Sequence, residues 1–413
     1  MSEGRRRIAF VINSLGPGGA ERVLTTVLEN TPPDAWDVHL VLLDKEEEHR
    51  TPPPFVTVHR MDCGGRLTPS ISGLRRLLKE IAPEMVVSFL VRANVAAVIA
   101  ARTLSLPVVI SERAQLSTHL EGKRKGWRVW ASKVVPRLTY PRANHVIAVS
   151  EGVKLDLIEE FGVRADRVTS IPNPYDMDRI QRDGQAAAEI ALPPRFIVSV
   201  GRLVDSKGFA DLIDAYAIAR PAMPLVILGD GPEREALAAK VDSYGLKEWV
   251  KFGGYVRNPF AVVSRADLFV TASHCEGFPN ALAEAMALGV PVVATDCPSG
   301  PAELLDEAQA TGARDVYSAR HGLMAPVGQP TALARALEQM SDEQMRREYG
   351  QRARLRMAAY GLAPITERYW SLIAAVCDST GRLRTDAARP QPSAAEAPQP
   401  AVTCPRIFGP PQA

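Results

Sequence analysis

The sequence predicts an α/β protein with two doubly wound parallel sheets. Short apolar runs alternate with helix-forming segments along the chain, which is the pattern of successive βαβ units. The pattern occurs twice, before and after Ile171-Pro-Asn-Pro-Tyr175, where two prolines interrupt it. The length of 413 residues also exceeds that of one ordinary domain. We therefore expect two similar domains that face a cleft.

The expected strands are short and apolar in both halves. They cover residues 7–12, 37–43, 56–60, 85–89, 107–111 and 145–149, and then 195–200, 224–228, 249–252, 267–271 and 290–294. Helices are expected between them, for example Gly19 to Leu28, Lys207 to Ala219 and Glu233 to Gly245. The expected domains are 1–170 and 171–355, followed by a helix over 356–378. Residues 379–413 are rich in Ala, Pro, Gln and Ser, and this composition predicts a disordered tail.

Composition excludes several classes of function. The net charge of +2 predicts no general affinity for nucleic acid. No apolar run approaches the length of a membrane span, and the run after the basic N-terminus is too short for a signal peptide. Five scattered cysteines, at positions 63, 275, 297, 377 and 404, indicate a reducing cytoplasm and argue against a zinc site.

The stretch Glu276-Gly-Phe-Pro-Asn-Ala-Leu-Ala-Glu284 is the most informative in the chain. One carboxylate lies in the loop after an expected strand, and the second lies about one turn inside the helix that follows. Between them, N–H groups of residues such as Asn280 and Ala281 form a helix N-terminus, which favours anions. Two carboxylates beside an anion site suit a sugar nucleotide. The alternative is two solvated glutamates, one of them on an exposed helix face.

Two other loops follow expected strands. Asn13-Ser-Leu-Gly-Pro-Gly-Gly-Ala-Glu-Arg22 lacks both the spacing of a dinucleotide-binding loop and the Lys of a P-loop. Its glycines permit either close approach to a ligand or tight strand–helix packing. Gly201-Arg-Leu-Val-Asp-Ser-Lys-Gly208 places two cations near a helix N-terminus, where the helix dipole disfavours them, and therefore indicates a bound anion.

These motifs together resemble the retaining glycosyltransferases of family 4, which have the GT-B fold of two Rossmann-like domains. In that fold a C-terminal helix crosses back to the first domain, and the resemblance implies the same for the helix expected over 356–378. The resemblance rests on Glu-x7-Glu, on Gly-Gly-Ala-Glu-Arg and on the segment with Arg202 and Lys207. It implies that Glu276 contacts the transferred sugar, that Glu284 binds the ribose hydroxyls, and that Arg202 and Lys207 neutralise the leaving diphosphate. The other donor-side residues that it implies are Gly18, Gly19, Tyr255, Val256, Gly277, Phe278, Pro279, Asn280 and Ala281.

Two segments bear on the donor sugar and the acceptor. Thr295-Asp-Cys-Pro-Ser-Gly-Pro-Ala-Glu303 resembles a subgroup that builds bacterial surface glycans, often from N-acetylhexosamine donors, but Ala302 stands where that subgroup commonly has Arg. Many family members carry a His near the reacting centre in the first domain. In Ser111-Glu-Arg-Ala-Gln-Leu-Ser-Thr-His119, Arg113 and His119 are the candidates for the acceptor side, with a surface His as the alternative.

Lysine and arginine are concentrated in residues 122–142, with no acid between Glu121 and Glu151. Trp127, Trp130 and Val134 recur there at helical spacing. Such a stretch suits an anionic membrane surface, and a core-facing stripe is the alternative. A lipid-diphosphate acceptor would account for the basic charge.

The resemblance implies a retaining, metal-independent enzyme that moves a hexose or N-acetylhexosamine (GalNAc or GlcNAc type) from a UDP-sugar to a glycan or lipid-linked glycan. The enzyme would be cytoplasmic or peripheral at the inner membrane face. No Asp-x-Asp triplet follows a strand, so neither a metal nor a cofactor is implied. The alternatives are a GT-B epimerase or hydrolase that acts on the UDP-sugar, or a catalytically silent GT-B membrane scaffold. The linkage, the oligomeric state and the role of Cys275 stay open.

Overall fold

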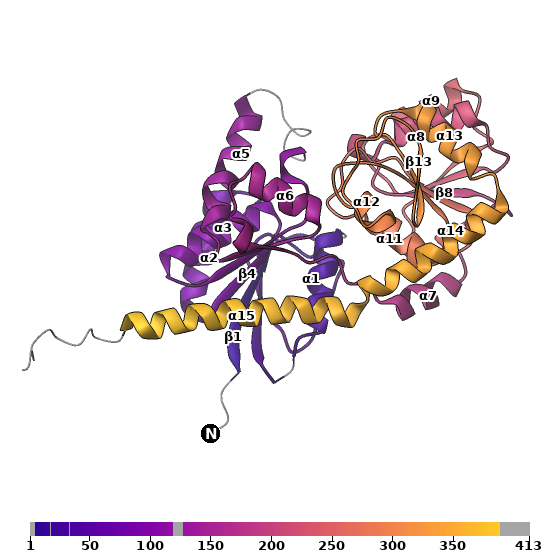
Figure 1. Ribbon diagram of the computed structural model, residues 1–413. Helices are drawn as coiled ribbons and strands as arrows, with labels where there is room; N and C mark the ends of the chain where they lie inside the picture. Colours follow the sequence, from indigo (N-terminus) through magenta and orange to yellow (C-terminus); the bar gives the residue numbers. More distant parts are fainter. Residues whose placement is uncertain (1–4, 17, 33, 119–126, 389–413) are drawn as a thin grey trace, which may run out of the picture.

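Two α/β domains lie side by side, and a long C-terminal helix runs along the base of the first (Figure 1). The computed structural model describes residues 5–16, 18–32, 34–118 and 127–388, with the backbone alone for 127–132 and 381–388. Each domain is built on a seven-stranded sheet.

The first sheet is parallel throughout and has the strand order β3-β2-β1-β4-β5-β6-β7. Its strands are β1 (Arg6–Ile12), β2 (Trp36–Leu42), β3 (Thr57–Arg60), β4 (Met85–Phe89), β5 (Val108–Glu112), β6 (His145–Ala148) and β7 (Val168–Ser170). The helices of this domain are α1 (Gly19–Glu29), α2 (Leu67–Ile81), α3 (Val91–Thr103), α5 (Trp127–Thr139) and α6 (Glu151–Glu159). The continuously apolar central strands β1, β4 and β5 are buried on both faces, as parallel strands require.

The second sheet has the order β10-β9-β8-β11-β12-β14-β13 and is parallel except at its last pair. Its strands are β8 (Ile197–Val200), β9 (Leu225–Leu228), β10 (Val250–Gly254), β11 (Leu268–Thr271), β12 (Val292–Thr295), β13 (Tyr317–Ala319) and β14 (Gly322–Ala325). Its helices are α7 (Met177–Gln185), α8 (Phe209–Ala219), α9 (Arg234–Ser243), α10 (Phe260–Val263), α11 (Asn280–Ala287), α12 (Pro301–Leu305), α13 (Pro330–Gln339) and α14 (Glu343–Arg356). Helices α8, α9 and α13 cover one face, and α7, α10, α11 and α14 pack together on the other.

Three short strands, β7, β13 and β14, were not predicted from the sequence. β7 and β13 have only three residues each, too few for a periodic pattern to be recognised, and the four residues of β14, Gly-Leu-Met-Ala, include no β-branched or aromatic residue. The last helix, α15 (Leu362–Ala388), extends past residue 378, so the predicted start of a disordered tail at 379 is wrong. Residues 389–413 lie outside the described residues.

Helix α15 joins the two domains because it leaves the second and packs on the first. Its Ile365, Tyr369, Trp370 and Ile373 share one buried cluster with residues of β1, β2 and α1. The Trp370 ring lies 5.7 Å from the ring of Phe10, in an edge-to-face arrangement, and its Nε1–H donates to Val27 O at 3.2 Å. The first sheet therefore depends on the C-terminal helix for the cover of one face.

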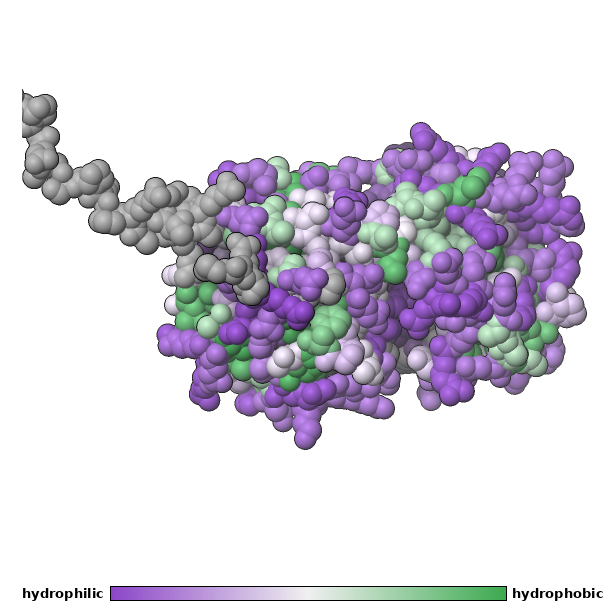
Figure 2. Space-filling model, turned by 90° about the horizontal axis from the view of Figure 1, so that it is seen from below, coloured by the Kyte–Doolittle hydropathy of each residue, from purple (hydrophilic) through white to green (hydrophobic). Residues whose placement is uncertain are grey.

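The molecular surface seen from below is largely hydrophilic, with hydrophobic side chains in separate groups (Figure 2). Within the described part of the chain, no helix combines the length and the apolar character that a membrane crossing needs.

Replacement of Trp370 by Ala tests the role of the crossover helix. It should destabilise the first domain by about 3–5 kcal/mol, because a buried aromatic side chain and its hydrogen bond are lost. The measurement is urea unfolding followed by circular dichroism. Leu355→Ala, at a position that is 77% exposed, is the control and should change stability little. Equal stability of the two variants would contradict the packing role of α15.

Candidate active site between the two domains

The carboxyl ends of β8 and β11 lie together in the second sheet, since these strands are paired. From this point the chain order proceeds in opposite directions, to β9 on one side and to β12 on the other. Ligands of open α/β sheets bind in the crevice at such a switch point. Helix α11 begins there at Asn280 and ends before Gly289, whose φ of +77° suits glycine.

Glu276 lies in this crevice and is held by residues of its own domain. Its Oε1 accepts hydrogen bonds from Lys207 Nζ at 2.6 Å and from Ser273 Oγ at 2.7 Å. The backbone carbonyl of Glu276 accepts a hydrogen bond from the Ser299 hydroxyl. A cavity of about 140 Å³ is lined by Lys207, Glu276 and the first turn of α11. A cation, a carboxylate and a helix N-terminus thus meet at one small cavity.

Glu284 is the second carboxylate of the motif, and its partner comes from the first domain. The residue is 9% exposed and forms an ion pair with Arg22 of α1. The nearby carboxylate raises the pKa of Arg22 above its ordinary value. Because an uncompensated buried charge is strongly destabilising, this pair links the two domains across the cleft.

The other predicted donor-side residues are less closely gathered. Arg202 is exposed, and its side chain forms no hydrogen bond or ion pair with any residue that the structure describes. Tyr255 is 71% exposed, whereas Val256 is buried in the core. Phe278 is also a packing residue, because its ring lies 5.6 Å from that of Tyr360. The structure brings Lys207, Glu276, Asn280 and Glu284 together but leaves Arg202 and Tyr255 at the surface.

Asn280, the first residue of α11, is the centre of a hydrogen-bond network at the junction of the domains. Its Oδ1 accepts from Asn173 Nδ2 at 2.6 Å and from Tyr175 OH at 2.8 Å. Asn173 in turn accepts from the guanidinium of Arg113, which also donates to Tyr369 OH at 2.7 Å. Arg113, predicted on the acceptor side, thus has its side chain in the junction between β5, the linker and α15.

Sequence reasoning missed Asn173 and Tyr175. Both lie in the proline-rich segment that marks the linker, and the polar side chains between those prolines were the available indication. For Tyr369 the sequence offered no indication of a functional role, because this residue belongs to the apolar face of a long helix.

Two glycines allow the domains to approach closely. A Cβ on Gly19 would lie 2.7 Å from Asn280 Nδ2, and a Cβ on Gly277 would collide with the backbone carbonyl of Arg113. Both are predicted donor-side positions, and in the structure both are close contacts between domains. Gly18 precedes α1 in an extended conformation and, in this structure, lies next to the side chain of Glu21.

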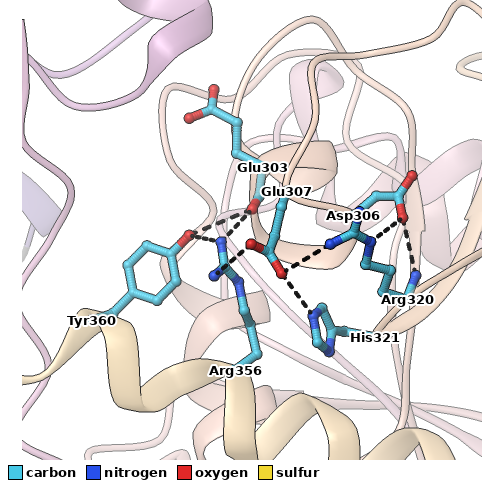
Figure 3. Close-up of polar contacts among 7 residues, drawn as sticks. All are labelled: Glu303, Asp306, Glu307, Arg320, His321, Arg356 and Tyr360. Carbon is cyan, nitrogen blue, oxygen red and sulfur yellow. Dashed lines mark hydrogen bonds and ion pairs between the residues drawn. The ribbon is translucent and has the colours of Figure 1, made fainter.

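The segment 295–303 also joins the domains. Gly300 has a φ of +93°, and Glu303 accepts hydrogen bonds from the N–H groups of Glu151 and Gly152 at 2.9 and 3.0 Å, at the start of α6. Burial raises the pKa of Glu303, and these N–H groups oppose that shift. Figure 3 shows its carboxylate directed away from a second cluster, in which Arg356 and Tyr360 contact its backbone carbonyl. The segment 295–303 is thus held by α6 of the first domain on one side and by Arg356 and Tyr360 on the other.

The structure says less about three other features that the sequence singled out: Cys275, His119 and the basic stretch 122–142. Cys275 is partly buried, and burial raises its pKa to about 11, so the thiol is neutral at physiological pH. His119 lies outside the described residues. Of the basic stretch 122–142, side chains are described from residue 133 onward; Arg137 pairs with Glu160 at 3.1 Å, and Leu138 is 55% exposed.

Comparisons with known proteins agree with this geometry. Residues 17–179 match the family "Glycosyltransferase Family 4", and residues 181–356 match "Glycosyl transferases group 1". The chain is 30% identical over 371 residues to N-acetylgalactosamine-N,N'-diacetylbacillosaminyl-diphospho-undecaprenol 4-alpha-N-acetylgalactosaminyltransferase of Campylobacter jejuni, covering 86% of this chain and 96% of that relative. A second Campylobacter jejuni N-acetyl-D-galactosaminyltransferase, whose named substrate is also undecaprenol-linked, is 28% identical over 90% of this chain and 99% of the relative.

Solved structures support the fold. Anabaena HepE in complex with UDP and glucose has a TM-score of 0.69 at 22% identity, over 90% of this chain and all of that one. Sucrose-phosphate synthase of Thermosynechococcus elongatus has a TM-score of 0.73 at 17% identity, over 91% of this chain and all of that one. The predicted pair of Rossmann-like domains is confirmed, and the chain belongs to the family 4 glycosyltransferases with the GT-B fold.

Proposed function

We propose that the protein transfers a hexose or N-acetylhexosamine, of the GalNAc or GlcNAc type, from a UDP-sugar to a lipid-linked glycan during bacterial surface-glycan synthesis. The observation that carries this proposal is the pairing of each motif carboxylate with a cation on either side of the α11 N-terminus. The names of the two Campylobacter relatives favour an N-acetylhexosamine and an undecaprenol-linked acceptor. The titles of the HepE complexes, which contain UDP or UDP-glucose, favour a UDP donor.

In the proposed reaction the diphosphate lies at the N-terminus of α11, near Lys207. Negative charge grows on the β-phosphate as the glycosidic bond breaks, and a fixed cation stabilises that charge more than it stabilises the bound substrate. Glu276, whose carboxylate accepts a hydrogen bond from Lys207, contacts the transferred sugar. Arg202, which follows β8 and has an exposed side chain, is proposed to neutralise the leaving diphosphate together with Lys207.

Glu284 is proposed to bind the ribose hydroxyls. Its carboxylate forms an ion pair with Arg22, so the ribose must share this carboxylate with Arg22 or displace it. As a further part of the proposal, the reaction retains the anomeric configuration, with the departing UDP accepting the acceptor's proton on the same face. It needs neither a metal nor a separate cofactor, because Lys207 supplies the counter-charge.

The basic stretch 122–142 is proposed to contact an anionic membrane surface. The described part of α5 exposes Leu138 and Val135, 55% and 36% respectively. Apolar side chains next to basic ones suit the headgroup region, where a lipid-linked acceptor would be presented.

Glu284→Ala should weaken UDP binding by about ten- to a hundredfold, since hydrogen bonds to a charged group are lost. Isothermal titration calorimetry with UDP is the measurement. Glu338→Ala, which removes an exposed carboxylate on α13, is the control. Wild-type affinity in the Glu284 variant would remove this residue from the ribose site.

Lys207→Ala should lower kcat/KM by about a hundredfold or more, because the counter-charge of the leaving group is lost. Lys251→Ala, at an exposed lysine that pairs with Glu248, should keep normal turnover. The assay measures UDP release with acceptor present. Comparable turnover in the two variants would refute the proposed role of Lys207.

A donor panel tests the function as a whole. The protein is incubated with each of several UDP-sugars and with membrane lipid extract, with and without EDTA, and the products are analysed by mass. We expect one added N-acetylhexosamine or hexose on a lipid-linked species, unaffected by EDTA. Free sugar or an epimer without any transfer product would contradict the transferase activity, and full loss on chelation would contradict metal independence.

A further inference from the structure

A histidine–aspartate pair lies beside the candidate active site and has no part in the reaction proposed above. His274 is in the loop that follows β11, two positions before Glu276. Its Nε2 lies 2.8 Å from Oδ2 of Asp211, which belongs to the first turn of α8. Because a carboxylate can only accept, the imidazole N–H donates this hydrogen bond. The side chains are 32% and 24% exposed, so water reaches the pair only in part.

The segment that carries Lys207 lies between the two members of this pair. Its short 3-10 helix, Asp205–Lys207, ends at Gly208, and α8 begins at the next residue. The backbone N–H of His274 donates to the carbonyl of Ser206 at 2.9 Å. Gly208 has a φ of +62°, and a Cβ there would collide with the carbonyl of Ala272. The Lys207 segment is therefore packed directly against the backbone of the Glu276 loop.

Lys207 has a long side chain, whose position depends on the backbone beneath it. Its Nζ lies 2.6 Å from Oε1 of Glu276, and the side chain is 29% exposed. A lysine side chain loses much rotamer freedom when it is held in one conformation. A small displacement of its backbone relative to the Glu276 loop would therefore move the ammonium group away from the place where it is needed.

We propose that His274 and Asp211 are positioning residues for Lys207, an inference that rests on the proposed function. Their hydrogen bond ties the start of α8 to the loop that carries Glu276, and the Lys207 segment is held between these two elements. The ammonium group then stands at the leaving diphosphate before the glycosidic bond breaks. A cation placed in advance needs no reorganisation as negative charge develops. The pair itself does not contact the donor, and its effect on turnover passes through Lys207.

The test measures UDP release from UDP-N-acetylgalactosamine and UDP-N-acetylglucosamine, with membrane lipid extract as the acceptor. His274→Leu and Asp211→Leu remove the hydrogen bond, whereas His274→Gln and Asp211→Asn keep a donor or an acceptor at the same place. Asp214→Leu is the matched control, because Asp214 also lies on α8 and pairs with Lys240 instead. His274→Leu is also combined with Lys207→Ala. Thermal unfolding of each variant checks that the fold is retained.

His274→Leu and Asp211→Leu should each lower kcat by about tenfold and change KM for the UDP-sugar much less, because the counter-charge matters most in the transition state. His274→Gln and Asp211→Asn should recover most of this loss. Asp214→Leu should keep normal turnover even if its melting temperature falls. In the Lys207→Ala background, His274→Leu should cause no further loss, since the residue through which it acts is already absent.

Two results would overturn the inference and leave the proposed function intact. The first is turnover in both leucine variants equal to that of Asp214→Leu, while Lys207→Ala is impaired. The second is a double variant whose loss equals the product of the two single losses, because His274 would then act independently of Lys207. If His274→Leu does not fold, Asp211→Leu alone and in the Lys207→Ala background decides. A wild type that releases UDP from neither donor would contradict the proposed function, and the inference with it.

Discussion

Glu276, in the loop after β11, and Glu284, inside α11, carry carboxylates that require counter-charges, and the partners that supply these charges organise the cleft. Glu276 and Glu284 are largely shielded from water, where an unpaired charge would be costly. The first is neutralised within its own domain by Lys207, and the second across the cleft by Arg22. One helix terminus therefore carries a local ion pair and an interdomain ion pair. In the proposed function, the diphosphate and the ribose hydroxyls of the donor compete for both ion pairs.

The same helix terminus is fixed by a network that belongs to neither domain alone. Asn280 receives hydrogen bonds from the linker, and Arg113 connects the linker to α15. A fully paired buried network strengthens its members and favours one arrangement over others. Since α15 also covers a face of the first sheet, the position of α11 depends on the packing of the whole chain. The same contacts therefore set both the closure of the two domains and the geometry of the site.

Most of the fold was predictable because its elements are local. The central strands of both sheets are continuously apolar, and the glycine- and proline-containing turns between them mark their ends. The failures were also local in cause: β7 and β13 are too short to show a pattern, β14 lacks β-branched and aromatic residues, and α15 continues into a segment whose composition changes. Gly19 and Gly277 are predicted donor-side positions, and the structure shows a further requirement for glycine at each, the close approach of the other domain.

The sequence by itself determined which chemical groups stand at the strand ends, because a strand, a turn and the first turns of a helix fix the relative positions of Glu276 and Glu284 within a few residues. Only the tertiary structure decided their partners across the cleft. Arg22 meets Glu284, the start of α6 meets Glu303, and Arg113 meets Tyr369 across 256 positions of the sequence. Such contacts depend on how two separately folded sheets are placed by the linker and by α15, and no local pattern encodes that placement.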